Sequence, residues 1–343
     1  MKDLNCKKTN VDVAITLLHV IGMVMIFLCH ALQLEKIYFL SEIFISGVPL
    51  FLFVSGYLAG RRKIGNVGKW YLGKAKRVLL PALIFFVTVY GIYEITGIES
   101  VSLFQWIFSL CNLQGLNYTY WKFEVFGTVP GCGHLWFVTS LMFCYLLTPL
   151  LQRFKKISLK RWQGALLTVA VLACQLGLMY VGFQLSYIVT FFFGYFLAGK
   201  EIRTDSLWFG FVTLLTVLVC GARLALKNVL DGSDFYDRYF ALISSAFIAA
   251  WIFYAVYFLK AKAPKPLDRI SCPALLFTES ISYYFYLTHY LFFRGPFAVF
   301  GYIPNRLPAH VLAFVFSYVS GAAMYFAIEK GLFKIFERRK ENK

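Results

Sequence analysis

The stretch from Gly47 to Pro81 reads GVPLFLFVSGYLAG (47–60), then RRKIGNVGKWYLGKAKR (61–77), then VLLP (78–81). An apolar segment with a Ser-Gly step is followed by a loop with many positive charges, and a proline opens the next apolar segment. The loop contains seven Lys or Arg residues and no acidic residue. Such a loop indicates either the cytoplasmic side of a membrane protein, where basic residues gather, or a site for a polyanion.

The composition of the whole chain is that of a membrane protein. Hydrophobic residues make up 59% of the 343 residues and charged residues only 15%, which a soluble domain of this size does not show. A helix that crosses a bilayer needs roughly 20 apolar residues. We expect one all-α membrane domain over 1–343, embedded over approximately 11–330. Its helices are expected at about 11–32, 42–60, 78–98, 134–152, 163–182, 184–200, 206–226, 238–260, 272–294 and 308–329.

The distribution of basic residues predicts how these ten helices are oriented. If the N-terminus is cytoplasmic, 27 of the 34 Lys and Arg residues lie on the inner side and 7 on the outer side. This bias follows the positive-inside rule and places both termini in the cytoplasm. The net charge of +17 therefore predicts a multi-pass membrane protein and needs no nucleic-acid partner to explain it. The first apolar run is expected to stay as a helix and not to be cleaved as a signal.

Polar residues of the first predicted helix lie on one helical face. Asp12, Thr16, His19 and His30 fall on a single series with steps of three and four. At 1.5 Å per residue, the two histidines are about 16 Å apart along the axis. They therefore line one path and do not share one substrate atom. Ionisable groups inside a membrane are costly and face a cavity or a partner, although two histidines satisfied by neighbouring helices are the structural alternative.

The 272–294 helix repeats this pattern. Glu279, Ser282, Tyr286 and His289 again follow steps of three and four, and His289 is expected toward the outer surface, like His30. The long connection over about 99–133 is expected outside, and its aromatic residues suit either sugar rings or the membrane interface. At its end, the 134–152 helix opens with two further candidates, His134 and Trp136.

Other charged residues and the cysteines allow fewer conclusions. Arg223 is interpreted as a snorkelling anchor near the outer end of its helix, with a carboxylate partner as the alternative. The eight cysteines show no metal-ligand spacing, and no metal site is expected. Cys111 and Cys132 share the outer connection, where a disulfide between them is one possibility in an oxidising compartment.

Several short motifs, in order, resemble the integral-membrane acyltransferase family 3, the polytopic O-acyltransferases of bacterial surface glycans. FLFVSGYLAG (51–60) resembles its Ser-Gly motif. The sequence from Lys74 to Pro81 is similar to its basic motif. GHLWFVTSLMFCYLLTP (133–149), FFFGYFLAG (191–199) and ISYYFYLTH (281–289) resemble its later signatures. The first helix of the family has an Arg, ten residues and then a His. This chain departs from that pattern, because His19 stands at the Arg position, and Lys74 stands where an Arg is usual.

The resemblance implies an enzyme. The donor would be a cytoplasmic acyl-CoA, with acetyl-CoA the first expectation, and no cofactor would be bound permanently. The acceptor would be a sugar hydroxyl of an extracytoplasmic or lipid-linked glycan. The catalytic candidates are His30 as base or acyl carrier and His19, which could replace the Arg only as a weaker donor. Contacts to the donor are expected from Lys74, Arg77, Arg61, Arg62 and Ser55, and the acceptor path from His134, Trp136, Glu279, Tyr286 and His289.

Two other functions share the same sequence features. A transporter of a polysaccharide or a lipid-linked precursor would also have polar helix faces around a central path. A membrane scaffold would not need the buried histidines and Glu279. If the protein is an enzyme, which we expect to be a monomer, acyl-CoA binds to it and changing His30 abolishes ester formation. If it is a transporter, removing it abolishes the exported glycan, and CoA does not affect its activity.

Overall fold

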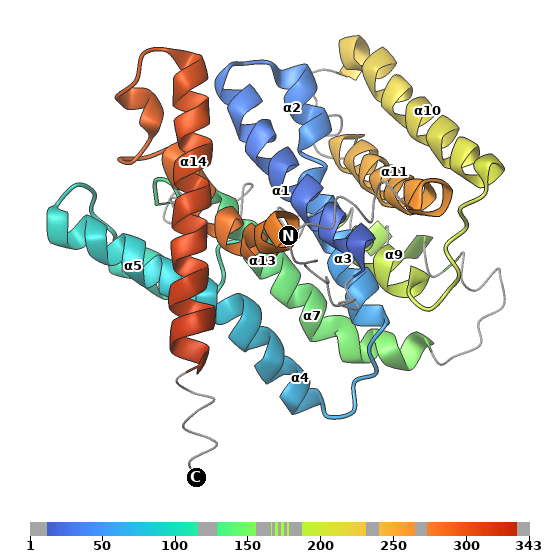
Figure 1. The fold of residues 1–343 in the computed structure, drawn as a ribbon, viewed down its shortest axis with the longest axis horizontal. Helices are drawn as coiled ribbons and strands as arrows, with labels where there is room; N and C mark the ends of the chain where they lie inside the picture. The colour runs from blue at the N-terminus through green and yellow to red at the C-terminus, as the bar shows by residue number, and fades with distance from the viewer. Residues whose placement is uncertain are drawn as a thin grey trace, which may run out of the picture.

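The computed structural model describes residues 12–115, 129–155, 187–230, 240–264 and 273–334, with a few isolated positions between 166 and 177. It is an all-α bundle (Figure 1). The longer described helices are α1 (Val13–Leu34), α3 (Gly47–Gly60), α5 (Leu80–Thr96), α7 (Trp136–Lys155), α10 (Ser206–Leu230), α11 (Ala241–Lys262), α13 (Pro273–Thr288) and α14 (Arg306–Tyr325). Shorter ones are α2 (Tyr38–Phe44), α4 (Val67–Lys74), α6 (Leu103–Leu110) and α9 (Ile188–Leu197).

Seven of the described helices are long and apolar enough to cross a membrane. Two further predicted spans are present in shorter form, since α9 has 10 residues and α13 has 16. A 3-10 turn, η5 (His289–Phe292), extends α13 toward the predicted end of its span. The predicted helix at 163–182 lies largely outside the described residues. The all-α membrane architecture is confirmed, and the orientation of the termini stays a prediction.

The basic stretch is mostly helical, which corrects the expectation of a loop over 61–77. Residues 67–96 form one continuous span, in which a π turn, η1 (Ala75–Leu79), joins α4 to α5. The cause is Pro81, which lacks the N–H that would bond to the carbonyl of Arg77 and whose ring crowds that carbonyl. A widened turn directly before a proline relieves this conflict. Lys74 and Arg77 therefore lie inside the span and not at its start.

The Ser-Gly segment packs backbone to backbone against α9. A Cβ atom on Gly56 would collide with the carbonyl oxygen of Phe191, and one on Gly194 would collide with that of Phe53. Small residues at such positions let membrane helices approach closely. The glycine Gly56 of α3 thus serves close helix approach. This contact holds Ser55 and the start of the basic stretch at a fixed place in the bundle.

The outer connection contains more structure than expected. Ser102 caps the start of helix α6 and forms a capping box with Gln105, and α6 contacts Tyr90 of α5 through Trp106 and Ser109. The aromatic residues of this connection at 118, 120 and 121, and the acidic residue at 124, lie outside the described residues. Cys111 is exposed and Cys132 is buried, and both are free thiols, so the possible disulfide between them is not formed.

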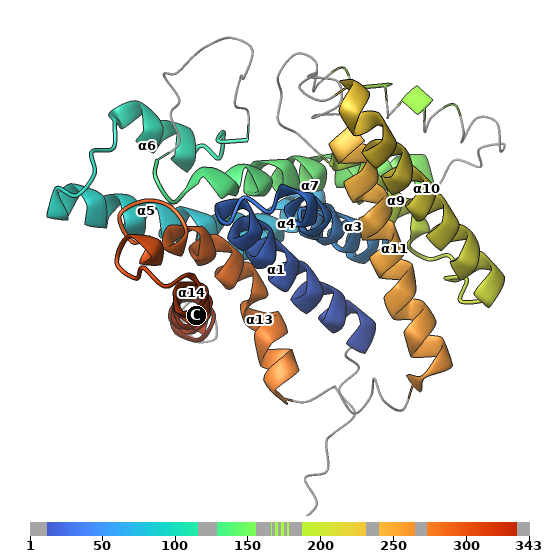
Figure 2. The ribbon, with the colours of Figure 1, turned by 90° about the horizontal axis from the view of Figure 1, so that it is seen from above.

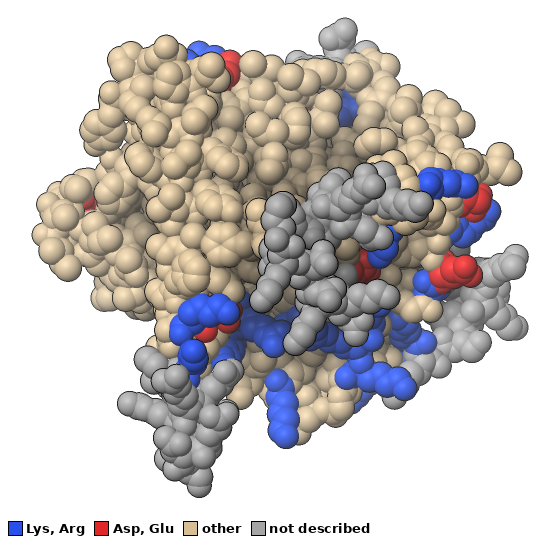
Figure 3. Space-filling view, in the orientation of Figure 1, with Lys and Arg blue, Asp and Glu red and all other residues tan. Residues whose placement is uncertain are grey.

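This arrangement places polar residues of α1 and α13 in the middle of the bundle and basic residues at one end of it. Helices α1 and α13 pack side by side in the middle of the bundle (Figure 2). Lys and Arg gather along one end of the face shown in Figure 3, near the ends of α3 and α4, and are sparse over the rest of it. By the positive-inside rule, that end is predicted to be the inner side.

Candidate functional site

Three histidines from distant parts of the sequence meet between α1, α7 and α13. The ring centroids of His30 and His289 are 5.3 Å apart, and those of His134 and His289 are 4.8 Å apart. His30 lies in α1, His134 in the 3-10 turn η3 (Gly133–Leu135) that precedes α7, and His289 opens η5 after α13. His134 and His289 are buried. The predicted clustering of histidines toward one level of the bundle is thus a direct contact among three of them.

One backbone carbonyl determines the tautomers of two of these rings. The carbonyl oxygen of Tyr286 accepts hydrogen bonds from Nε2 of His134, at 2.9 Å, and from Nδ1 of His289, at 2.7 Å. Because a carbonyl oxygen only accepts, both nitrogens carry protons. The Tyr286 hydroxyl in turn donates to the carbonyl of His134 at 2.5 Å. In the neutral rings, Nδ1 of His134 and Nε2 of His289 therefore carry lone pairs.

These two lone pairs have no hydrogen-bond partner among the described residues. A buried polar atom without a partner is unfavourable by about 1–3 kcal/mol, and such atoms concentrate at functional sites. Although three imidazoles meet here, no set of three metal-binding side chains in the described part of the chain is arranged to hold an ion. The pair of lone pairs is instead suited to accept hydrogen bonds from a hydroxyl or to receive a proton.

His30 is oriented by a residue one turn away. Nδ1 of His30 lies 3.1 Å from Oε1 of Gln33, and its ring packs on Tyr290 at 4.7 Å between centroids. When Nδ1 donates to the Gln33 oxygen, Nε2 carries the lone pair and is the basic atom. A cavity of about 230 Å³ lies beside the ring. Its polar and aromatic lining consists of His30, Gln33, His134, Trp136, Tyr286 and Tyr290.

A second contact joins α1 to α13, nearer to the first residues of both helices than the three histidines are. Nδ1 of His19 lies 3.0 Å from Oε1 of Glu279, and the His19 ring stacks on Phe51 with centroids 5.9 Å apart. Eleven residues separate His19 from His30, and ten separate Glu279 from His289. The two helices thus present matched polar residues at two levels, about 15 Å apart. His19 bonds to a carboxylate, as an Arg at its position could, but offers fewer donors.

Lys74 lies at the centre of the basic stretch. Its Nζ atom is 3.7 Å from the ring centroid of Tyr145 and 4.7 Å from that of Trp70. Arg62 and Arg77 are close enough to repel its charge. Within the described residues, none of these three cations forms an ion pair with a carboxylate. Arg62, Lys74 and Arg77 are here called the basic cluster, and aromatic faces hold its Lys74 without neutralising the charge.

The other predicted donor contacts divide into two groups. The Ser55 hydroxyl lies near that of Tyr145, whose ring supports Lys74, so Ser55 lies next to the basic cluster. Arg61 lies instead 3.6 Å from the Asp12 carboxylate, which also accepts a 2.6 Å hydrogen bond from Lys260. Asp12 caps α1 through the backbone N–H of Ala14. In this structure Arg61 therefore lies beside Asp12 at the start of α1, and the Asp12 carboxylate neutralises its charge.

Aromatic side chains link the basic cluster to the histidines. The Tyr283 hydroxyl donates to the carbonyl of Val78 in the π turn, at 2.7 Å. The Tyr283 ring stacks on Tyr286 with centroids 6.5 Å apart, and the Tyr286 ring meets His134 at 5.1 Å. Each step is a direct contact between named groups. The basic stretch and the histidine cavity are therefore parts of one packed unit, as expected for two ends of one path.

Sequence reasoning missed several residues of this site. Gln33 and Tyr290, which orient His30, were not singled out, and neither was Tyr145, which supports Lys74. The spacing of Gln33, three residues after His30, is a signal that was available because such residues share a helical face. No local signal marks Tyr145, since its role depends on how α7 packs against α4. The contact between His19 and Glu279 was also not foreseen, although the predicted polar faces contained both.

Comparison with known proteins identifies the family. The family described as an acyltransferase domain, acyltransferase 3, matches residues 12–327. A curated relative, the succinoglycan biosynthesis protein ExoH of Rhizobium meliloti (strain 1021), is 36% identical over 145 residues. That match covers 39% of this chain and 36% of the length of the relative. No solved structure matches the chain.

The family match includes each of the elements described above. It runs from Asp12, which caps α1, through the basic cluster and the three histidines, to the end of α14. This extent is most of the chain and all of the site. The expected resemblance is confirmed, and the chain is a multi-pass membrane protein of the acyltransferase 3 family.

Proposed function

We propose that this protein is an O-acyltransferase of a bacterial plasma membrane that acts as a single-domain monomer. It moves an acyl group, with acetyl the first expectation, from cytoplasmic acyl-CoA to a hydroxyl of an extracytoplasmic or lipid-linked glycan. The observation that carries this proposal is the histidine cavity, connected by direct contacts to an uncompensated basic cluster. The name of the succinoglycan relative supports a polysaccharide or its precursor as the acceptor.

The basic cluster provides the donor site. Phosphates of acyl-CoA would replace the missing carboxylate partners of Arg62, Lys74 and Arg77, with the guanidinium groups able to bind them in bidentate fashion. Tyr145 and Trp70 hold Lys74 in place before the donor arrives. A cation that is already oriented loses less side-chain freedom on binding. The thioester end of the donor would then extend past Tyr283 and Tyr286 toward the cavity.

His30 provides the base. Its Nε2 lone pair takes the proton of the acceptor hydroxyl while the oxygen attacks the carbonyl carbon of the thioester. The carbon–sulfur bond then breaks, and the departing CoA sulfur receives the proton from the imidazolium. In the alternative sequence, Nε2 first carries the acyl group and the hydroxyl attacks that acyl-imidazole. Both sequences require the lone pair on Nε2, which the Gln33 contact favours.

The remaining polar residues orient the two substrates. Nδ1 of His134, which lines the cavity and has no partner among the described residues, accepts a hydrogen bond from a hydroxyl of the sugar, and the fully buried His289 packs against the His134 ring. Trp136 lines the same cavity and offers a flat apolar surface to a sugar ring. The His19–Glu279 pair lies on the inner side of the cavity, between the donor and acceptor ends.

The experiment that tests this function compares acyl-ester content of surface glycans in the native strain, a deletion strain and a His30→Ala strain. Expression of the two proteins is matched by immunoblot. We expect esters to vanish in both mutants while the glycan itself remains. His310→Ala is the matched control, because His310 bonds to Glu35 and does not line the cavity. Esters should persist in that strain.

A different result would identify a transporter. Loss of the glycan on deletion, with glycan and esters untouched by His30→Ala, would contradict the enzymatic role. Purified protein then decides whether CoA is a ligand at all. Binding of acetyl-CoA by isothermal titration, abolished by neutralising the basic cluster and not by His30→Ala, is the expected outcome for the enzyme.

A further inference from the structure

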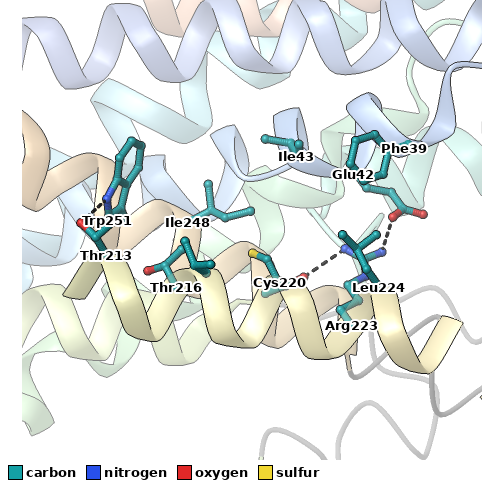
Figure 4. A pocket seen from close by; sticks show the side chains of 12 residues that line it. Phe39, Glu42, Ile43, Thr213, Thr216, Cys220, Arg223, Leu224, Ile248 and Trp251 are labelled. Carbon is teal, nitrogen blue, oxygen red and sulfur yellow. Dashed lines mark hydrogen bonds and ion pairs between the residues drawn. The ribbon is translucent and has the colours of Figure 1, made fainter. Parts of the chain in front are cut away.

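A second cavity lies beside α10, away from the three histidines. It has a volume of about 300 Å³ and is lined almost entirely by apolar groups from α2, α10 and α11. On α10 the lining residues Thr213, Thr216, Cys220 and Leu224 follow helical steps of three and four and form one stripe (Figure 4). Ile248 and Trp251 of α11 form the opposite wall. We call this cavity the α10 groove.

The α10 groove opens toward lipid. Only 11% of the apolar window of α10 is buried inside the protein, the lowest share among the seven candidate spans. Leu214 and Leu218, on the other side of the same helix, are more than half exposed. In a membrane protein these surfaces contact hydrocarbon chains. A chain from the bilayer therefore enters the groove without leaving an apolar environment.

One end of the α10 groove is charged. The Arg223 guanidinium lies 2.9 Å from the Glu42 carboxylate and donates to the Ser244 hydroxyl at 3.0 Å. The Arg223 side chain is only 9% exposed, so the expected snorkelling anchor is wrong and the carboxylate partner is correct. Arg223 is seventeen residues into α10, as His30 is into α1. The polar end of the groove and the histidine cavity thus lie at similar depths, about 25 Å from the inner ends of their helices.

The α10 groove and the histidine cavity share a wall. Glu42 and Ile43 of α2 line the groove, while Ile45, directly after α2, lines the histidine cavity. Tyr187 lies near both cavities. Its hydroxyl lies near Ser245 and Arg223, and its ring lies 6.4 Å from that of Trp136 in the histidine cavity. A molecule whose chain fills the groove would place its head group next to this wall.

We propose that the α10 groove holds the hydrocarbon chain of the membrane lipid that carries the acceptor glycan. The apolar stripe binds the chain, the Arg223–Glu42 end marks where its polar head begins, and α2 directs the attached sugar into the histidine cavity. The acceptor is therefore a lipid-linked glycan and not a free polysaccharide. This inference rests on the proposed acyltransferase function, whose acceptor it specifies.

The test fills the α10 groove with a larger side chain and compares acetyl transfer to two acceptors. Purified protein in liposomes receives radiolabelled acetyl-CoA and either the lipid-linked glycans extracted from the native strain or the same glycans released from lipid by mild acid. Thr216→Trp places an indole in the groove, and Leu218→Trp, on the lipid-facing side of α10, is its matched control. We expect Thr216→Trp to raise KM for the lipid-linked acceptor at least tenfold and to leave transfer to the released glycan within twofold.

Ile248→Phe fills the groove from α11 and should give the same selective loss if Thr216→Trp does not fold. Gel filtration and binding of CoA show which variants are intact. An unchanged KM for the lipid-linked acceptor in intact variants would overturn the inference, as would an equal loss on both acceptors or an equal effect of Leu218→Trp. A wild-type protein that acetylates only the released glycan would also overturn it. Transfer to neither acceptor would contradict the proposed function itself.

Discussion

The histidine cavity and the basic cluster differ in how the protein treats polar groups. In the cavity, the Tyr286 carbonyl orients two neutral rings, and each ring keeps a lone pair buried without a partner. In the basic cluster, aromatic faces support Lys74, and no described carboxylate neutralises it. Buried nitrogen atoms at the cavity have no hydrogen-bond partner, and the positive charges of the basic cluster have no carboxylate partner. The cavity is therefore suited to a neutral polar ligand, and the basic cluster is suited to an anion.

This difference predicts distinct kinetic effects, and the largest is at His30. Replacing His30 with Ala removes the basic nitrogen while leaving the donor site intact. General bases contribute about 10²–10⁴-fold to rate, so we expect kcat to fall at least a hundredfold with KM for acetyl-CoA within twofold. Steady-state kinetics of the purified protein measures both. A rise in KM alone would show that His30 only binds substrate.

Lys74→Met should produce the opposite pattern. A hydrogen bond to a charged group contributes about 1.5–3 kcal/mol, so losing it should raise KM for acetyl-CoA roughly tenfold or more while kcat changes little. Lys74→Arg should recover most of the affinity because the charge is kept. The effect should shrink for a donor analogue that lacks the phosphates of CoA. Equal losses with both donors would place Lys74 outside the phosphate site.

A smaller effect is expected for Tyr286→Phe. The ring remains, but the hydroxyl that bonds to the His134 carbonyl is removed. A buried acceptor left unsatisfied is unfavourable by about 1–3 kcal/mol, so the thermal midpoint should fall measurably. The rate should fall by less than in His30→Ala, because the Tyr286 carbonyl still orients both rings. A loss as large as that of His30→Ala would assign the hydroxyl itself a catalytic role.

Arg61→Ala should have the smallest effect on KM for acetyl-CoA. It tests whether Arg61 and Lys74, both in the basic stretch, have different roles. Arg61 lies near Asp12, which Lys260 also contacts, and its side chain is half exposed. Such a pair contributes about 0–1 kcal/mol, and KM for acetyl-CoA should change less than twofold. Measuring KM for Arg61→Ala and Lys74→Met in the same assay decides which of the two side chains contacts the donor. A tenfold rise in KM for Arg61→Ala would return Arg61 to the donor site, as the sequence predicts.

Much of the fold was predictable because lipid restricts what a chain can do. Apolar stretches of about 20 residues must form helices, since the backbone has no other hydrogen-bond partners in hydrocarbon. The spans at α1, α7, α10, α11 and α14 follow this rule. The predicted start of the third span, at 78, is too late in the chain, because a π turn lets the helix that begins at Val67 continue where the proline removes a hydrogen bond. Periodicity does not distinguish a widened turn from a helix start.

The site was predicted as faces but not as contacts. Steps of three and four placed His19 and His30 on one face and Glu279 and His289 on another. Which histidine meets which residue depends on the relative height of α1 and α13. The sequence of one helix contains no information on the height of its neighbour. The same limit hid Arg223, whose partner Glu42 lies in a different helix.

The sequence by itself determined that this chain is an all-α membrane protein, that its basic residues favour one side, and that its motifs resemble the acyltransferase 3 family. These properties are sums over local residues and periods. Only the tertiary structure decided that three histidines meet, that two of them line one cavity, that Tyr286 orients two of them, and that Arg61 is neutralised while Lys74 is not. Those facts are distances between side chains on different helices, and the packing of the helices determines them.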